Sequence, residues 1–401
     1  MVVREDKVIN YLAIALGCSM CLQRISAAVG NVFFISGILI FFYLLYQRQR
    51  AGEHLFRIDE SVKGYYKAFA IFFVSLLPAV VGTGDILASM GIVTHNWIYR
   101  WFPFFAITLF VRDRQILMKL LMAFMVIMGL ECLTAVGQSL ILDKYRPWGF
   151  SGHPMHLASF LCFFTPILAV IVLDNRFKGS IKTMAIISLI CCLAGVLLGN
   201  SRGAWLCLFI ILPLLSWPYI KSNKKYMCIV GIICCMVVGI FVANPAYQHR
   251  LISITNTTTD RSNADRILIW ESARNMVQDH PLIGVGPGNF KKVYDKQYKS
   301  PEITQDLPHT HNNFVQIAAE YGLIGLGGFL YFIIYVLKRN YYEMKNGNPY
   351  ARMRLGFFLG FLLFGMIDHT LWGTVFNKLL SFLLGILIVL DIESTKDNIT
   401  G

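Results

Sequence analysis

Long apolar blocks, each close to the length that crosses a bilayer as a helix, are the feature that most constrains this chain. About 20 consecutive apolar residues span the hydrocarbon core of a membrane as an α-helix. Hydrophobic residues make up 56% of the 401, and only 15% are charged, against about a quarter in soluble chains. The chain is therefore predicted to be an all-α polytopic membrane protein. We identify twelve blocks, at about 8–22, 27–47, 66–83, 97–112, 115–135, 156–174, 183–199, 203–220, 226–243, 313–337, 353–368 and 374–391.

Lysine and arginine are distributed unevenly among the segments that join these blocks. If the N-terminus lies inside, the segments on its side of the membrane hold 22 basic residues, and the short segments on the other side hold six. Basic residues are retained on the cytoplasmic side of membrane proteins. We therefore expect cytoplasmic termini and an external loop at 244–312. The net charge of +13 reflects this asymmetry and contact with membrane lipids, so it does not indicate nucleic acid.

The external loop is expected to separate two groups of membrane helices. Its first part, 244–265, is rich in Ser, Thr, Asn and Asp and is expected to be irregular. Residues 265–281 have the apolar spacing of an amphipathic helix, which Asp265 could cap. The predicted parts of the chain are residues 1–243 with nine helices, the loop 244–312, and residues 313–401 with three helices and a cytoplasmic tail.

Two histidines stand directly before the tenth block, in "PHTHNN" (308–313). A histidine at a helix entrance can act as a general base, because its unperturbed pKa is about 6.5. His309 and His311 are equally compatible with surface or capping roles. Asn312 or its neighbour is expected to cap the helix, which Gly322 would interrupt. The i, i+2 spacing of the histidines, with no carboxylate cluster nearby, predicts neither a metal site nor a cofactor.

Arginines on the same external side could bind an anion. Arg202 lies in the tight turn "LLGNSRGAW", and Arg266 and Arg274 lie two turns apart on the loop helix. A planar guanidinium binds phosphate through two hydrogen bonds. Each arginine could instead reach the membrane interface or lie on a solvated helix face. Anion binding is therefore one of two interpretations of these arginines.

A second polar stretch, "YRPWGFSGHPMHLASF" (145–160), lies on the same side. Trp148, His153 and His156 could stack on a sugar or hydrogen-bond to it, or they could simply belong to a capped loop. The glycines of "GVGPGNF" (284–290) follow no predicted strand, so we expect them to build a turn and not a nucleotide site.

Taken together, these pieces resemble the O-antigen ligase and O-antigen polymerase superfamily of bacterial envelope glycosyltransferases. The resemblance covers roughly 145–335. Its motifs are "GFSGHPMHLASF", "NSRGAW", "DRILIWESARNMVQDHPLIGVGPGNF" and "HTHNNFVQIAAEYGLIGLGGF". Members of this superfamily are multispanning proteins with one large periplasmic loop before a late span.

The resemblance implies a location in the bacterial inner membrane and a site that faces the periplasm. It implies transfer of O-antigen glycan from undecaprenyl diphosphate to the lipid A-core oligosaccharide. His311 would be the catalytic base, and Arg202 and Arg266 would contact the diphosphate. Arg274, His309 and Asn312 are possible secondary contacts, as are Trp148, His153 and His156. Arginine can supply the charge that a leaving diphosphate needs, so the implied mechanism is independent of metal.

Two alternatives stay open at this level. O-antigen polymerases of the same superfamily often carry a glycine eleven residues after an external arginine. No glycine stands eleven residues after Arg250, Arg261, Arg266 or Arg274 in the loop. Arg202 is followed at that spacing by Pro213, so the pattern favours a ligase. A transporter or flippase of lipid-linked glycan would need polar residues near the bilayer midplane and repeat symmetry. The sequence instead gathers its polar residues on one side.

Overall fold

The computed structural model of the protein describes residues 2–56, 58–254, 260–303, 305–371 and 373–400. Every element in these ranges is a helix, which confirms the predicted all-α class. The helices are α1 (Val2–Leu22), α2 (Ala27–Arg50), α3 (Glu60–Val81), α4 (Ile86–Val93), α5 (Phe102–Phe110), α6 (Arg114–Leu140), α7 (Pro154–Leu173), α8 (Ser180–Leu198), α9 (Arg202–Ser222), α10 (Lys224–Ala243), α11 (Pro245–Ile252), α12 (Arg261–Asp279), α13 (Phe290–Val293), α14 (Asn313–Lys345), α15 (Pro349–Gly365) and α16 (Thr374–Thr400). Two π-helical turns are η1 (Thr94–Tyr99) and η2 (Tyr294–Tyr298).

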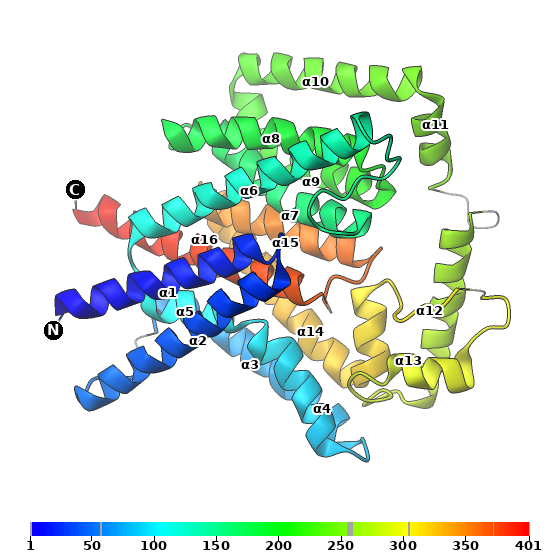
Figure 1. Ribbon diagram of the computed structural model, residues 1–401, viewed down its shortest axis with the longest axis horizontal. Helices are drawn as coiled ribbons and strands as arrows, with labels where there is room; N and C mark the ends of the chain where they lie inside the picture. The colour runs from blue at the N-terminus through cyan, green and yellow to red at the C-terminus, as the bar shows by residue number, and fades with distance from the viewer. Residues whose placement is uncertain (1, 57, 255–259, 304, 372, 401) are drawn as a thin grey trace.

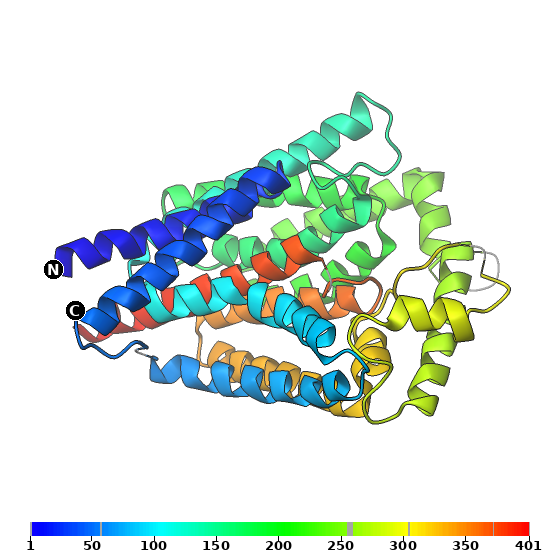
Figure 2. The same cartoon turned by 60° about the horizontal axis from the view of Figure 1, so that its bottom comes forward.

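The long helices form one bundle, and the loop elements α11, α12 and α13 gather at one of its ends (Figure 1). The beginning of α1 and the end of α16 lie at the opposite end (Figure 2). The pairs α1–α2, α3–α14 and α7–α15 make extensive contacts, and α7 and α16 are the most buried of the long apolar helices. One continuous hydrophobic core connects these helices.

Eight helices among the described residues are long and apolar enough to cross a membrane: α2, α3, α6, α7, α8, α9, α14 and α16. The protein is therefore a polytopic membrane protein. The other four predicted blocks fall on α1, α5, α10 and α15, of which α5 has nine residues and α15 has 17. The count of twelve spans and the three-part division of the chain stay predictions. Arg57, one of the basic residues that support the topology, lies outside the described residues.

The prediction of a single span at 97–112 is wrong in its boundaries. The return from α3 begins at α4, where the Asp85 side chain accepts a hydrogen bond from the backbone N–H of Ala88. It continues through η1 and ends as the short helix α5, which has Pro103 in its first turn. A π-turn and a proline are the usual causes of an interrupted helix. The segment that follows α3 is thus a broken helix and not one continuous helix.

The loop 244–312 is also more helical than its composition suggested. Residues 245–252 form α11 in the segment expected to be irregular, and α13 and η2 follow the glycine turn. The loop helix α12 begins at Arg261, and its cap is Asp260, whose side chain accepts from the backbone N–H of Asn263 at 3.1 Å. The predicted cap, Asp265, is instead buried inside the helix. Its place on the face that carries Ile269 explains this burial.

A break in α14 receives the glycine-rich turn. Gly322 has φ 64°, which interrupts the helix as predicted. The backbone N–H of Leu323 donates to the carbonyl of Pro281 at 2.8 Å, and the N–H of Val285 donates to the carbonyl of Ala319 at 2.9 Å. Backbone groups that the helix break leaves unpaired therefore pair with the turn. A Cβ at position 322 would lie 2.3 Å from the carbonyl carbon of Leu282.

Glu320 also lies at this joint between the glycine-rich turn and the break in α14. It is fully buried, and the backbone carbonyl of the same residue accepts a hydrogen bond from the N–H of Gly286 at 3.0 Å. The Gln316 side chain donates to the Glu320 side chain at 3.1 Å. These contacts confirm that the glycine run builds a turn, and they fix this turn against the first third of α14.

We predict that Gly322→Ala destabilises the protein by about 1–3 kcal/mol, because the backbone conformation is strained for an L-residue and the turn would have to move. Gly327→Ala is the matched control on the same helix, since a Cβ there meets no atom within 4 Å. Thermal unfolding of both purified variants in detergent checks this. Equal midpoints for the two variants would contradict the role given to the joint.

Candidate functional site

The histidine stretch forms a tight loop at the start of α14. Asn312 caps this helix as predicted, and its side chain accepts from the backbone N–H groups of Phe314 and Val315 at 2.9 and 3.2 Å. Thr310 is fully buried, and its backbone N–H donates to the Gln316 side chain at 2.9 Å. His311 is left in the left-handed region with φ 53°. Such a conformation is uncommon for a residue with a Cβ, and it persists only where the surroundings impose it.

Asp368 is the partner of His311. It follows the end of α15, and its Oδ1 lies 3.2 Å from His311 Nδ1. The two segments are clamped by Asn313, whose side chain donates to Thr370 Oγ1 at 2.6 Å and accepts from the backbone N–H of Thr370 at 3.0 Å. Burial raises the pKa of Asp368, but the hydrogen bond with His311, a backbone hydrogen bond at His369 and the electrostatic influence of His311 and His309 together bring this pKa to about 2. The carboxylate is therefore ionised when it meets the imidazole.

His309 supports this pair from the other side. Its Nδ1 accepts a hydrogen bond from the backbone N–H of His311 at 3.2 Å, and its ring stacks on His369 with centroids 4.0 Å apart. Burial and the neighbouring His311 lower the pKa of His309 to about 4. His309 is consequently a neutral ring at physiological pH, in which Nδ1 acts as an acceptor.

Arg266 faces this cluster from α12. The Trp270 indole of the same helix donates to the Thr310 carbonyl at 2.7 Å, which ties α12 to the histidine loop. Burial lowers the pKa of the Arg266 guanidinium, and the charges of Asp368 and Arg202 act on it in opposite directions. Among the described residues, no hydrogen-bonding partner of Arg266 is present. Its five donors are thus available to an anion.

Arg202 reaches the same region from the first turn of α9. Its Nη1 donates to Asp260 Oδ2 at 2.7 Å and to the carbonyl and hydroxyl of Ser253, both at 2.8 Å. Its Nη2 has only two long contacts, at 3.4 Å, to Asp260 and Asn263. One face of the guanidinium therefore joins α9 to the loop, and the other is weakly engaged.

Two further arginines, Arg146 and Arg250, belong to this cluster and were not among the predicted site residues. Burial lowers the pKa of Arg146, and so do the charges of Arg250, Arg202 and Arg266. The buried Nε atoms of Arg146 and Arg250 have no hydrogen-bonding partner among the described residues. The signal in the sequence was the presence of each arginine in a polar stretch on the predicted external side. Nothing there indicated that stretches about 100 residues apart would meet.

The second polar stretch contributes unevenly. His153 caps α7 by accepting from the backbone N–H of Met155 at 3.2 Å, and burial lowers its pKa, with His156 adding to the effect and Asp368 opposing it. His156 lies edge-on to the Phe376 ring. The Trp148 ring is covered by Lys144, whose Nζ is 3.5 Å from the ring centroid. His153 thus borders the histidine cluster, whereas the face of Trp148 is already occupied.

A buried ion pair holds this stretch to the bundle. Arg24, between α1 and α2, pairs with Glu131 of α6. Arg24 also donates a hydrogen bond to the Ser151 hydroxyl, which in turn donates to the Glu131 carboxylate. The guanidinium of Arg24 also lies over the Phe160 ring, 3.5 Å from its centroid. Buried charges are tolerated when they are paired and hydrogen-bonded. The pair therefore fixes the position of the loop that carries His153.

Arg274 is the predicted residue that the structure separates from the others. It is exposed on α12, two turns from Arg266. No group of three His, Cys, Asp or Glu side chains in the described ranges is arranged to hold a metal ion. The metal-independent mechanism stays a prediction, as do the roles of the individual site residues.

Comparison with known proteins points to one family. Residues 187–330, which contain Arg202, the helix α12 and the histidine loop, match the O-antigen ligase family model. The chain is 33% identical over 121 residues to a candidate polysaccharide ligase of Rickettsia bellii, and 32% identical over 119 residues to another of Rickettsia conorii. It is 22% identical over 168 residues to an uncharacterized protein of Haemophilus influenzae.

The Rickettsia matches cover 29% and 28% of this chain and the same shares of the relatives, and the Haemophilus match covers 38% and 41%. The matched part of the chain thus spans less than a third of the length of the two polysaccharide ligases. The family match over residues 187–330 includes part of α8, all of α9, the loop and the first half of α14, which carry most of the cluster. The resemblance to the O-antigen ligase superfamily, first seen in the motifs, is therefore confirmed.

Proposed function

We propose that the protein is an O-antigen ligase, which transfers O-antigen glycan from undecaprenyl diphosphate to the lipid A-core oligosaccharide. The observation that carries this proposal is the pairing of His311 with an ionised Asp368 beside a group of partly buried arginines. Glycosyl transfer from a lipid diphosphate needs a base for the acceptor hydroxyl and cations for the leaving group. The family match over 187–330 supports the same reading.

The orientation we propose places this site at the periplasmic face of the inner membrane. The cluster lies at the end of the bundle where the loop gathers, and the chain ends lie at the other (Figure 2). The excess of basic residues is on the side of the chain ends, which favours a cytoplasmic location for them. Both lipid-linked substrates would then present their sugars at the height of the helix ends.

In the proposed reaction, His311 acts as the general base. Its Nδ1–H donates to Asp368, so Nε2 keeps its lone pair. Nε2 takes the proton of the acceptor hydroxyl while the hydroxyl oxygen bonds to the anomeric carbon of the donor glycan. The bond from that carbon to the diphosphate oxygen breaks, and undecaprenyl diphosphate leaves as an anion. The imidazolium then returns its proton to water.

The arginines would stabilise the charge that develops on the diphosphate. Arg266 has no competing protein partner among the described residues, and Arg202 can offer Nη2, which has only long contacts. Arg146 and Arg250 have unpartnered Nε atoms in the same cluster. Fixed donors aimed at developing charge contribute more inside a protein than in water. His309 is a neutral ring that holds the His311 backbone, so we assign it a positioning role.

We predict that purified protein joins the two lipid substrates without an ion gradient, and that His311→Gln lowers the rate at least about 10²-fold. Glutamine keeps a hydrogen bond but cannot accept the proton. His309→Asn should retain most activity because its side-chain oxygen can accept the same backbone N–H, and exposed His280→Gln is the matched control. Glycan transfer is measured by gel separation of the lipopolysaccharide product. Near-normal transfer by His311→Gln would refute the mechanism.

The same experiment separates the alternatives. A polymerase would lengthen the donor glycan and leave the lipid A-core unmodified. A flippase would form no covalent product and would only move lipid-linked glycan between leaflets. Either outcome with active protein would replace the ligase proposal.

We predict that Arg266→Lys reduces transfer by about 10²-fold although the charge is kept, since an ammonium cannot reproduce two parallel hydrogen bonds to a phosphate. Arg274→Lys makes the same change on the exposed face of the same helix and should leave the rate within about twofold. Initial rates at saturating acceptor and varied donor concentration provide the comparison. Equal losses in the two variants would show that the position of Arg266 has no special role.

The orientation can be tested with single cysteines in a cysteine-free background. Lys299 and Lys345 are both exposed, but they lie after η2 and at the end of α14, on opposite ends of the bundle. We predict that cysteine at 299 reacts with a membrane-impermeant maleimide in intact spheroplasts, whereas cysteine at 345 reacts only after lysis. The reverse pattern would overturn the proposed topology.

A further inference from the structure

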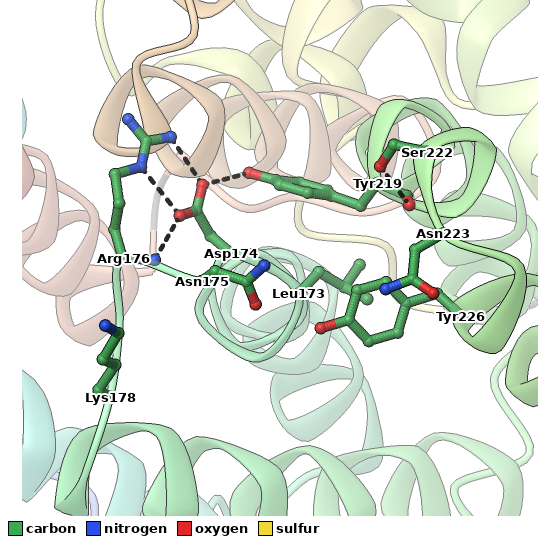
Figure 3. A pocket seen from close by; sticks show the side chains of 9 residues that line it. All are labelled: Leu173, Asp174, Asn175, Arg176, Lys178, Tyr219, Ser222, Asn223 and Tyr226. Carbon is green, nitrogen blue, oxygen red and sulfur yellow. Dashed lines mark hydrogen bonds and ion pairs between the residues drawn. The ribbon is translucent and has the colours of Figure 1, made fainter.

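A pocket opens at the end of the bundle opposite to the histidine cluster. It lies between the turn from α7 to α8 and the turn from α9 to α10 (Figure 3). Its volume is about 700 Å³. The side chains that line it come from both turns and are mostly polar: Leu173, Asp174, Asn175, Arg176, Lys178, Tyr219, Ser222, Asn223 and Tyr226.

One wall of this pocket is a prearranged hydrogen-bond network. Asp174 accepts from Arg176 Nε at 2.9 Å and Nη2 at 2.7 Å, and from the Tyr219 hydroxyl at 2.7 Å (Figure 3). Arg176 Nη2 also donates to the carbonyl of Gly347, in the turn before α15. The Tyr219 ring lies under Arg352, whose guanidinium carbon is 4.5 Å from its centroid. The only carboxylate that lines the pocket is thus already neutralised.

The charge that remains at the pocket is positive. The two turns and the helix ends beside them, residues 174–182 and 219–226, carry six basic residues and one acidic residue. Lys178 lines the pocket and makes no ion pair with a described residue, while Arg176 keeps its Nη1 free of the contacts above and has 57% of its side chain exposed. Such a group of cations attracts anionic head groups at about 1 kcal/mol for each residue near the surface.

The position of the pocket matches the head-group layer of a membrane. Leu173 and Ser222 are the last residues of α7 and α9, both long enough to span a bilayer. On α9, the apolar side chains of Leu214 and Trp217 are 52% and 62% exposed within two turns of the pocket. Exposed tryptophan near the end of a membrane helix is typical of the interface between lipid and water.

We propose that this pocket binds the phosphate head group of an anionic phospholipid such as phosphatidylglycerol. Lys178 and Arg176 bind the phosphate, and the Tyr226 hydroxyl and Asn223 bind the polar part of the head group. The exposed apolar surface of α9 lies along the path of an acyl chain, which selects a lipid over free phosphate. In the orientation proposed above, the lipid belongs to the cytoplasmic leaflet. The inference does not depend on the transferase activity.

The test uses the full-length protein in detergent, equilibrated with equal amounts of phosphatidylglycerol and phosphatidylethanolamine and examined by native mass spectrometry. The protein should retain phosphatidylglycerol preferentially. Lys178→Glu should lower its retention about tenfold, because the change reverses a charge at the phosphate. Lys221→Glu makes the same change in the last turn of α9 outside the pocket lining, and should alter retention less than about twofold. Millimolar inorganic phosphate should not displace the lipid.

Several results would overturn the proposal. Equal loss of lipid in the two lysine variants would mean that surface charge alone holds the lipid. Unchanged retention of lipid in Lys178→Glu would mean that the lipid does not bind in the pocket. Displacement by inorganic phosphate would make the ligand a free anion. Tyr226→Phe, which removes one hydroxyl without changing charge or fold, should weaken retention severalfold. If Lys178→Glu proves misfolded on size exclusion, Tyr226→Phe decides the question, and full retention of phosphatidylglycerol by that variant would reject the site.

Discussion

The backbone joint between the glycine-rich turn and the break at Gly322 is the constraint on which the site depends. Without a Cβ at this position, the carbonyl carbon of Leu282 can approach the helix, and the exposed ends of the broken α14 pair with the turn. The turn leads directly from α12, so the joint sets the distance between that helix and the start of α14. Arg266 on one element and His311 on the other are therefore held in fixed relation although neither lies in the joint.

Charge imbalance gives the cluster its chemical character. Cations that are partly withdrawn from water are normally paired, because an unpaired charge in a poorly solvated place costs free energy. Here Asp260 neutralises Arg202, but Arg146, Arg250 and Arg266 share no carboxylate of their own among the described residues. Asp368 is already occupied by His311. An arrangement of this kind is most stable when a multivalent anion enters it, and a diphosphate is such an anion. If the donor diphosphate binds there as proposed, its binding and the folding of the loop would be linked for this reason.

Local signals in the sequence predicted local structure well, and contacts between distant segments could not be read from it. Asn312 as a cap and Gly322 as a break follow from residue chemistry within one turn of helix. Asp260 was missed as a cap because Asp265, five residues later, satisfied the same rule. Asp368 stands 57 residues from its partner, and only the packing of α15 against α14 brings it to His311.

The pairing of His311 with Asp368 is the central claim, and a double-mutant cycle on the transfer rate tests it most directly. Asp368→Asn should lower the rate by about 10²–10⁴-fold in the wild-type background, because the amide no longer orients or stabilises the imidazole. In the His311→Gln background the same change should have almost no further effect, since residues that act as one unit are not additive. Purified variants with matched folding and donor affinity supply the four rates. If the rate loss in the double variant instead equals the product of the losses in the two single variants, the account is contradicted.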